Sequence, residues 1–131
     1  MGLKNGHKDL IVWQKSLDLA DAVYVLTRSF PKEEIYGLIS QMRRCAVSIP
    51  SNIAEGSGRK TKKDFVRFLA IAYGSALELE TQLLLSQRFG YTHSIDAAEA
   101  HNLLDEVLRM LNKMTALKPS NEKLATSNSL L

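Results

Sequence analysis

The sequence predicts an all-α fold, an antiparallel up-down four-helix bundle. Four segments carry apolar residues at intervals of three and four positions, which is the period of an amphipathic helix. The connections between these segments are only a few residues long, and short connections favour antiparallel neighbours. No segment alternates apolar and polar residues as a half-buried strand does. Four helices packed side by side are therefore the expected architecture.

The predicted helices cover about residues 9–29, 33–56, 61–89 and 94–116. The first begins at Asp9, a residue suited to capping a helix, and ends before Pro31. The second keeps the phase of its apolar stripe across Pro50, which predicts a kinked helix there and not a loop. The bundle domain thus spans residues 1–117, and the polar, aperiodic residues 118–131 are expected to form a flexible C-terminal tail.

The third and fourth helices carry signals for their ends. Thr61 and Asp64 resemble a capping box, in which the threonine hydroxyl accepts a hydrogen bond from the backbone N–H three residues later. Gly90 suits the left-handed conformation that commonly follows a helix. Thr92 or Ser94 can start the fourth helix, since both have side-chain oxygens that cap free backbone donors.

Two of the predicted helices are apolar on more than one face. Leu83, Leu84 and Leu85 together span most of a turn of the third helix, and Leu17 with Leu19 widens the stripe of the first. A four-helix bundle buries one stripe per helix. The surplus predicts a second apolar contact, most simply with another copy of the chain.

Composition limits the kinds of protein and site that the chain can form. The 131 residues are 45% hydrophobic and 24% charged, as in an ordinary globular domain. A single cysteine, Cys45, excludes an internal disulfide, and the three histidines show no metal-ligand spacing. No targeting segment and no apolar run of about 18 residues is evident. We therefore expect a cytoplasmic protein of one domain without membrane contact, metal or cofactor.

Positive charge is concentrated in one part of the sequence. The segment from Arg43 to Arg67 has seven basic and two acidic residues, whereas the rest of the chain has ten basic and twelve acidic residues. Such a cluster can neutralise several phosphates and give salt-sensitive binding with little reading of bases. We predict a site for the backbone of RNA or DNA, with a solubilising polar corner as the alternative. The predicted binding residues are Arg43, Arg44, Arg59, Lys60, Lys62, Lys63 and Arg67.

Polar residues form a second stripe beside the apolar stripe of the second helix. Ser48, Asn52 and Glu55 follow helical spacing there, and Glu78 and Gln82 are four apart in the third helix. One interpretation is a pocket with a general-base carboxylate. The other, which we favour, is a structural polar network that satisfies groups freed by the internal proline. No nucleophile–base pair accompanies the carboxylates, so the sequence predicts no catalytic residue and no enzymatic activity.

Motifs in the first three predicted helices are long enough to compare with known families. They comprise Val12–Lys15, Tyr36–Leu38, residues 41–56, Gly58–Arg59, Phe65, Phe68–Leu69, Ala72, Gly74–Ser75 and residues 78–83. With these motifs, from about Asp9 to Tyr91, the chain resembles the four-helix-bundle family encoded in intervening sequences of bacterial 23S ribosomal RNA genes. The last helix and the tail resemble it only in general character.

The resemblance implies a bundle that assembles into a ring-like homo-oligomer, a homopentamer, with no established enzymatic activity. It also implies kinship with the accessory protein of diversity-generating retroelements, a basic pentameric barrel that works beside a reverse transcriptase. The leading hypothesis is therefore a non-enzymatic, ring-forming bundle that binds the backbone of RNA or DNA. The alternative is an assembly or adaptor module that recognises another protein and has no role with nucleic acid.

Overall fold

Four α-helices and two short 3-10 turns make up residues 4–116, the part of the chain that the computed structural model describes. The helices are α1 (Ile11–Thr27), α2 (Leu38–Ser57), α3 (Lys62–Arg88) and α4 (Ala98–Thr115). The 3-10 turn η1 (Gly6–Asp9) precedes α1, and η2 (Lys32–Glu34) lies in the connection between α1 and α2. The predicted tail, residues 118–131, falls outside the described residues.

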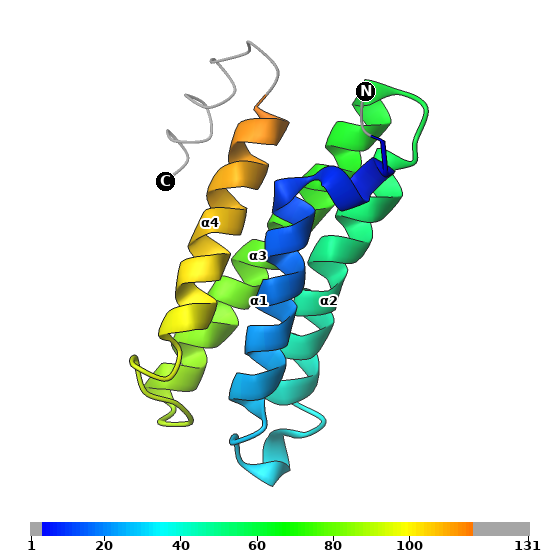
Figure 1. Ribbon diagram of the computed structural model, residues 1–131. Coiled ribbons are helices and arrows are strands. Elements are labelled where there is room, and N and C mark those ends of the chain that lie inside the picture. The colour runs from blue at the N-terminus through cyan, green and yellow to red at the C-terminus, as the bar shows by residue number, and fades with distance from the viewer. Residues whose placement is uncertain (1–3, 117–131) are drawn as a thin grey trace, which may run out of the picture.

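Consecutive helices run antiparallel and lie side by side as a four-helix bundle (Figure 1). α1 packs against α2 and α4, and α3 packs against the same two helices, so α1 and α3 occupy opposite corners. The centre is filled by fully buried side chains from all four helices, among them Leu19, Ile53, Leu79 and Leu104. The predicted all-α antiparallel bundle is confirmed.

The predicted starts of α1 and α4 are wrong, as is that of α2, described below. The Asp9 carboxylate accepts a hydrogen bond from the backbone nitrogen of Asn5 (3.1 Å) within η1, so it does not cap α1, which begins two residues later. Neither Thr92 nor Ser94 starts α4, because residues 93–97 form turns before the helix begins at Ala98. In both places, residues that were predicted to be helical lie in a turn before the helix begins.

α2 begins at Leu38 and not near Glu33 because the chain first makes η2 and a turn. Oε1 of Glu34 accepts a hydrogen bond from the backbone nitrogen of Leu38 (3.0 Å), and Oε2 accepts one from the Tyr91 hydroxyl (2.7 Å). These two bonds lower the pKa of Glu34, and the neighbouring carboxylate raises the pKa of Tyr91. Glu34 therefore caps α2 and ties two distant connections together.

Three other local predictions are confirmed, while the kink at Pro50 stays a prediction. α2 continues through Pro50 to Ser57, so no loop interrupts it. The Thr61 hydroxyl accepts from the backbone nitrogen of Asp64 (3.1 Å) and caps α3. Gly90 has φ +79° after α3, and the Tyr91 nitrogen donates to the Ser86 carbonyl (2.9 Å), the pattern of a Schellman motif.

The surplus apolar surface predicted for α3 lies on its outward face. Leu83 is fully buried, whereas Leu84 is 52% exposed, and Leu77, which lies on the same side of the helix, is 41% exposed. Ile71 is 44% exposed but lies on the other flank of α3. By length and composition α3 is apolar enough to cross a membrane, but a helix that buries one face in a bundle passes the same test. Nothing described in residues 4–116 covers this face, and contact with another copy stays a prediction.

Candidate nucleic-acid interface

The connection between α2 and α3 is held by a close helix approach at Gly56. A Cβ atom on Gly56 would lie 2.7 Å from Cβ of Phe68 and 3.2 Å from the backbone oxygen of Phe65. No side chain larger than hydrogen fits there without a shift of α3. The approach brings the ends of both helices together, and the short connection between them, residues 58–61, carries basic side chains across this junction. In the sequence, Gly56 stood out only as the end of the predicted helix 33–56.

Lys60, Lys62 and Lys63 are the most available cations of this connection. All three side chains are exposed, and none forms an ion pair with another residue in the described range 4–116. Lys62 and Lys63 belong to the first turn of α3, whose free backbone N–H groups add partial positive charge. We call these three residues, with Arg59 and Arg67, the basic turn.

The two arginines of the basic turn are held in place by Phe68. The guanidinium carbon of Arg59 lies 4.7 Å from the centre of the Phe68 ring, and that of Arg67 lies 4.9 Å from it. Arg59 also pairs with Glu55 (2.7 Å) and Arg67 with Asp64 (3.9 Å). Their charges are thus partly compensated, while their orientation is fixed in advance of binding.

A small hollow lies within the basic turn. Its volume is about 290 Å³, and it opens beside the N-terminus of α3. The hollow is lined by Gly56, Ser57, Arg59, Lys60, Thr61, Lys62 and Phe65. A concave surface with flexible ammonium groups and a helix N-terminus can accept a phosphate oxygen from several directions.

Arg43 does not belong to this surface. Its Nε donates to the Thr27 hydroxyl (2.9 Å), its Nη2 donates to the Tyr24 carbonyl (3.4 Å), and its guanidinium stacks 4.5 Å from the Tyr24 ring centre. The half-buried side chain therefore ties α2 to α1. Its neighbour Arg44 is exposed but lies about 20 Å along α2 from the basic turn. The prediction of one basic corner containing all seven residues is wrong.

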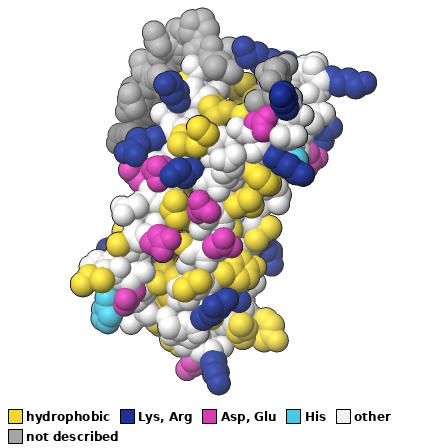
Figure 2. All heavy atoms as spheres, viewed as in Figure 1, with side chains coloured by type: hydrophobic (Ala, Val, Ile, Leu, Met, Phe, Trp, Pro, Cys, Tyr) yellow, Lys and Arg dark blue, Asp and Glu magenta, His cyan; other side chains and the backbone are white. Residues whose placement is uncertain are grey.

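Lysines from outside the predicted segment lie at the same end of the bundle. The 3-10 turn η1 packs against α1 and α2 there, and Lys4 before it and Lys8 within it are exposed. Figure 2 shows Lys and Arg side chains gathered toward the upper end of the molecule, where Figure 1 places the α2–α3 connection. These lysines are far from the basic segment in sequence, so only the tertiary arrangement joins them to it.

The predicted polar network is divided into two parts. The hydroxyls of Ser48 and Ser75 are 2.9 Å apart, and Nδ2 of Asn52 donates to the Ser48 carbonyl (2.9 Å) and hydroxyl (3.0 Å). This group links α2 to α3 and includes Ser75, which was not among the predicted network residues. Glu55 is not part of it, because its carboxylate pairs with Arg59.

The second part surrounds the buried Cys45. Burial raises the pKa of the Cys45 thiol to about 11, and the nearby Glu78 carboxylate acts in the same direction, while Gln82 partly opposes it. A thiol with so high a pKa is protonated at neutral pH and is a weak nucleophile. Oε1 of Gln82 is buried without a hydrogen-bond partner among the described residues. The arrangement positions no activated nucleophile beside the carboxylate.

Comparison with known proteins agrees with the fold and the motifs. A family model described as 23S rRNA-intervening sequence protein matches residues 8–113. The chain belongs to this family. The match includes α4, to which the sequence motifs did not extend, and confirms the predicted resemblance.

A solved structure is similar to this member of the intervening-sequence family. It is the crystal structure of a protein with unknown function from the S23 ribosomal protein family of Bacteroides thetaiotaomicron. The TM-score is 0.73 at 26% sequence identity, covering 81% of this chain and 99% of the other. No curated protein matches the chain.

Proposed function

We propose that this protein binds the phosphate backbone of RNA or DNA through the basic turn, as a homo-oligomer and without catalytic activity of its own. The proposal rests mainly on Lys60, Lys62 and Lys63, which are exposed and form no ion pair in residues 4–116. Lys60 and Lys62 line the hollow of the basic turn, and Lys63 follows in the first turn of α3. Lysines in such a setting attract phosphate with little dependence on base sequence. We also propose that the protein acts in the cytoplasm.

Backbone binding fits the basic turn better than recognition of bases does. Base recognition in single strands uses exposed aromatic rings as stacking platforms. Phe65 and Phe68 are buried, and two guanidinium groups flank the Phe68 ring. The turn therefore offers charge and a concave shape, but no exposed aromatic face to a base.

Binding of a structured RNA across a salt series tests this function. The triple variant Lys60→Ala, Lys62→Ala, Lys63→Ala is expected to bind more weakly and to reduce the slope of log affinity against log salt by about 2–3, one contact per lysine. A matched control, Arg28→Ala, Lys32→Ala, Arg88→Ala, removes three exposed cations at the opposite end. Absence of binding at low salt, or an equal loss in the control, would contradict the proposal.

The exposed face of α3 supports the proposed homo-oligomer. Leu77 and Leu84 lie on one side of the longest helix and present apolar surface there, and burial against another copy removes this surface from water. A ring would repeat the basic turn around one axis, so one nucleic acid could contact several turns at once.

Light scattering of the full chain measures this assembly directly. We expect a mass of several subunits for the protein, a pentamer by the family resemblance, and a lower mass for the variant Leu77→Glu, Leu84→Glu. Circular dichroism establishes that the variant keeps its helices. A protein that stays monomeric at high concentration would show that α3 does not serve as an interface.

A further inference from the structure

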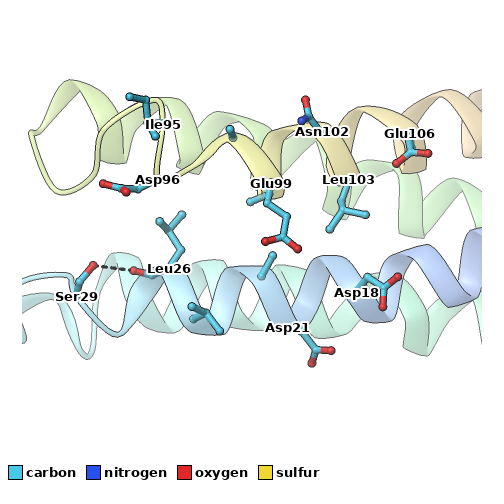
Figure 3. Close-up of a pocket in the computed structure, with 14 residues that line it drawn as sticks. Asp18, Asp21, Leu26, Ser29, Ile95, Asp96, Glu99, Asn102, Leu103 and Glu106 are labelled. Carbon is cyan, nitrogen blue, oxygen red and sulfur yellow. Dashed lines mark hydrogen bonds between the residues drawn. The ribbon is translucent and has the colours of Figure 1, made fainter.

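A groove runs between α1 and α4, on the side of the bundle away from the α2–α3 contact. Its volume is about 960 Å³. Small side chains explain the space: Ala22 on α1 faces a wall that includes Ala98 and Ala100 on α4, and methyl groups do not fill the gap between two helices. In Figure 3, Leu26 points from α1 toward α4, and Leu103 points back toward α1, so the floor is apolar.

Carboxylates line the edges of this groove. Asp18 and Asp21 come from α1, and Asp96, Glu99 and Glu106 come from α4 or the turn before it. Glu106 pairs with Lys15 (3.3 Å), whereas the other four form no ion pair with any residue of the described range. Figure 3 shows the Glu99 side chain directed into the gap, and Asp21 on the outer edge.

Exposed apolar side chains accompany these carboxylates. Val25 on α1 is 60% exposed, and Ile95 before α4 is 85% exposed. Both line the groove, so an occupant would contact apolar and acidic groups together. Helical spacing places Asp18, Asp21, Val25 and Ser29 on one face of α1 and its C-terminal extension, which gives the groove a length of about three helical turns.

The acidic edges of the groove indicate which kind of molecule can bind in it. No group of three acidic, histidine or cysteine side chains in residues 4–116 is positioned to hold a metal ion, so the carboxylates are dispersed and not convergent. Nucleic acid carries the same sign of charge as the groove and is repelled. A chain of dispersed cations with apolar side chains between them matches both the edges and the floor.

We propose that the α1–α4 groove binds a cationic amphipathic helix of a partner protein. Leucine-like side chains of about three turns would fill the space over Ala22 and contact Val25 and Ile95. Lysines or arginines on both flanks would face the carboxylates of α1 and α4. The groove and the basic turn lie on different helix pairs, so the protein can hold a basic polypeptide and an acidic polymer simultaneously.

Fluorescence anisotropy with labelled peptides tests the groove on the full chain. The probe is a synthetic peptide of about 12 residues with leucine and lysine at helical spacing. It is compared with a peptide of glutamate in place of lysine and one of serine in place of leucine. We expect saturable binding of the leucine–lysine peptide that weakens with salt, and at least tenfold weaker binding of the other two.

Two variants separate charge from shape. Asp18→Asn, Asp21→Asn, Glu99→Gln is expected to weaken binding about tenfold at low salt, because three exposed ion pairs are lost. Ala22→Leu keeps every charge and fills the groove floor, so it is expected to weaken binding independently of salt. The control Glu33→Gln, Glu80→Gln, Asp105→Asn removes the same charge from exposed positions outside the groove and is expected to bind the peptide normally.

Three results would overturn this inference: no binding of the leucine–lysine peptide, equal weakening in the control variant, or no effect of Ala22→Leu. Dissociation of an oligomer by the peptide, seen by light scattering, would also overturn it by showing that a second copy occupies the groove. RNA binding by the groove variants is expected to persist, since they retain the basic turn. Failure of the groove and failure of nucleic-acid binding are therefore distinguishable.

Discussion

The α2–α3 and α1–α4 sides of the bundle are built from similar amphipathic helices but differ in packing and charge. At Gly56 the first pair is in contact so close that a Cβ atom would overlap Phe68, and its connection is basic. At Ala22 the second pair leaves a groove, and its edges are acidic. A small residue therefore has opposite effects in the two pairs. Gly56 faces the large side chain of Phe68 and allows α2 and α3 to pack closely, whereas Ala22 faces other alanines, so a groove remains between α1 and α4.

Enlarging the small residue on each side should change stability in opposite directions. Gly56→Leu is expected to lower the free energy of unfolding by about 3 kcal/mol, because α3 must move away from α2. Ala22→Leu is expected to raise it by about 1 kcal/mol by filling open space. Chemical denaturation followed by circular dichroism measures both changes.

Gly74 provides the control for helix propensity. It lies within α3, and a Cβ atom there would meet nothing within 4 Å in the subunit. Gly74→Ala should therefore stabilise the protein by about 0.5–1 kcal/mol. Equal effects of enlargement at Gly56 and Ala22 would show that the two sides do not differ in packing.

Arg43 and Lys62 provide a second test, which separates structural from binding cations. Arg43→Ala removes bonds to Thr27 and Tyr24 and is expected to cost about 1–2 kcal/mol of stability with little change in the salt dependence of RNA binding. Lys62→Ala should leave stability unchanged and lower the salt slope by about one. If Arg43→Ala lowers the salt slope as much as Lys62→Ala does, Arg43 contacts the nucleic acid, and its exclusion from the binding surface is wrong.

Features that depend on one helix and its immediate neighbours could be predicted from the sequence. The apolar stripe crossed Pro50 in phase, and the cap at Thr61 and the turn at Gly90 follow from local backbone chemistry. The start of α2 could not be predicted, since Glu34 caps it from four residues away and is itself held by Tyr91. Long-range partners decide such a helix end.

In the candidate sites, too, features that depend on residues distant in the sequence could not be predicted. The cluster of basic residues in the sequence predicted the exposed lysines of the α2–α3 connection. It could not show that the Arg43 side chain bonds to Thr27 on α1. The groove was missed because its edges come from residues about 80 positions apart, each of which resembles an ordinary solvated helix face. The sequence did contain one indication of an acidic surface: outside residues 43–67, the chain has more acidic than basic residues.

The Glu34–Tyr91 hydrogen bond joins the two sides at the end of the bundle opposite the basic turn, and it should make stability depend on pH. A carboxylate whose pKa is lowered by folding stabilises the folded state in its ionised form. That stabilisation is present above the ordinary pKa of 4.5 and is lost as the pH falls below this value through the lowered pKa.

Glu34→Gln removes the titrating group but keeps an oxygen that can accept from Leu38. We expect the original protein to lose more stability than this variant between neutral pH and about pH 3, measured by denaturant unfolding at each pH. Glu33→Gln, which changes the exposed neighbouring carboxylate, should behave like the original protein. Parallel pH curves for all three proteins would mean that ionisation of Glu34 does not stabilise the folded protein, and that its bonds to Leu38 and Tyr91 do not depend on the charge of the carboxylate.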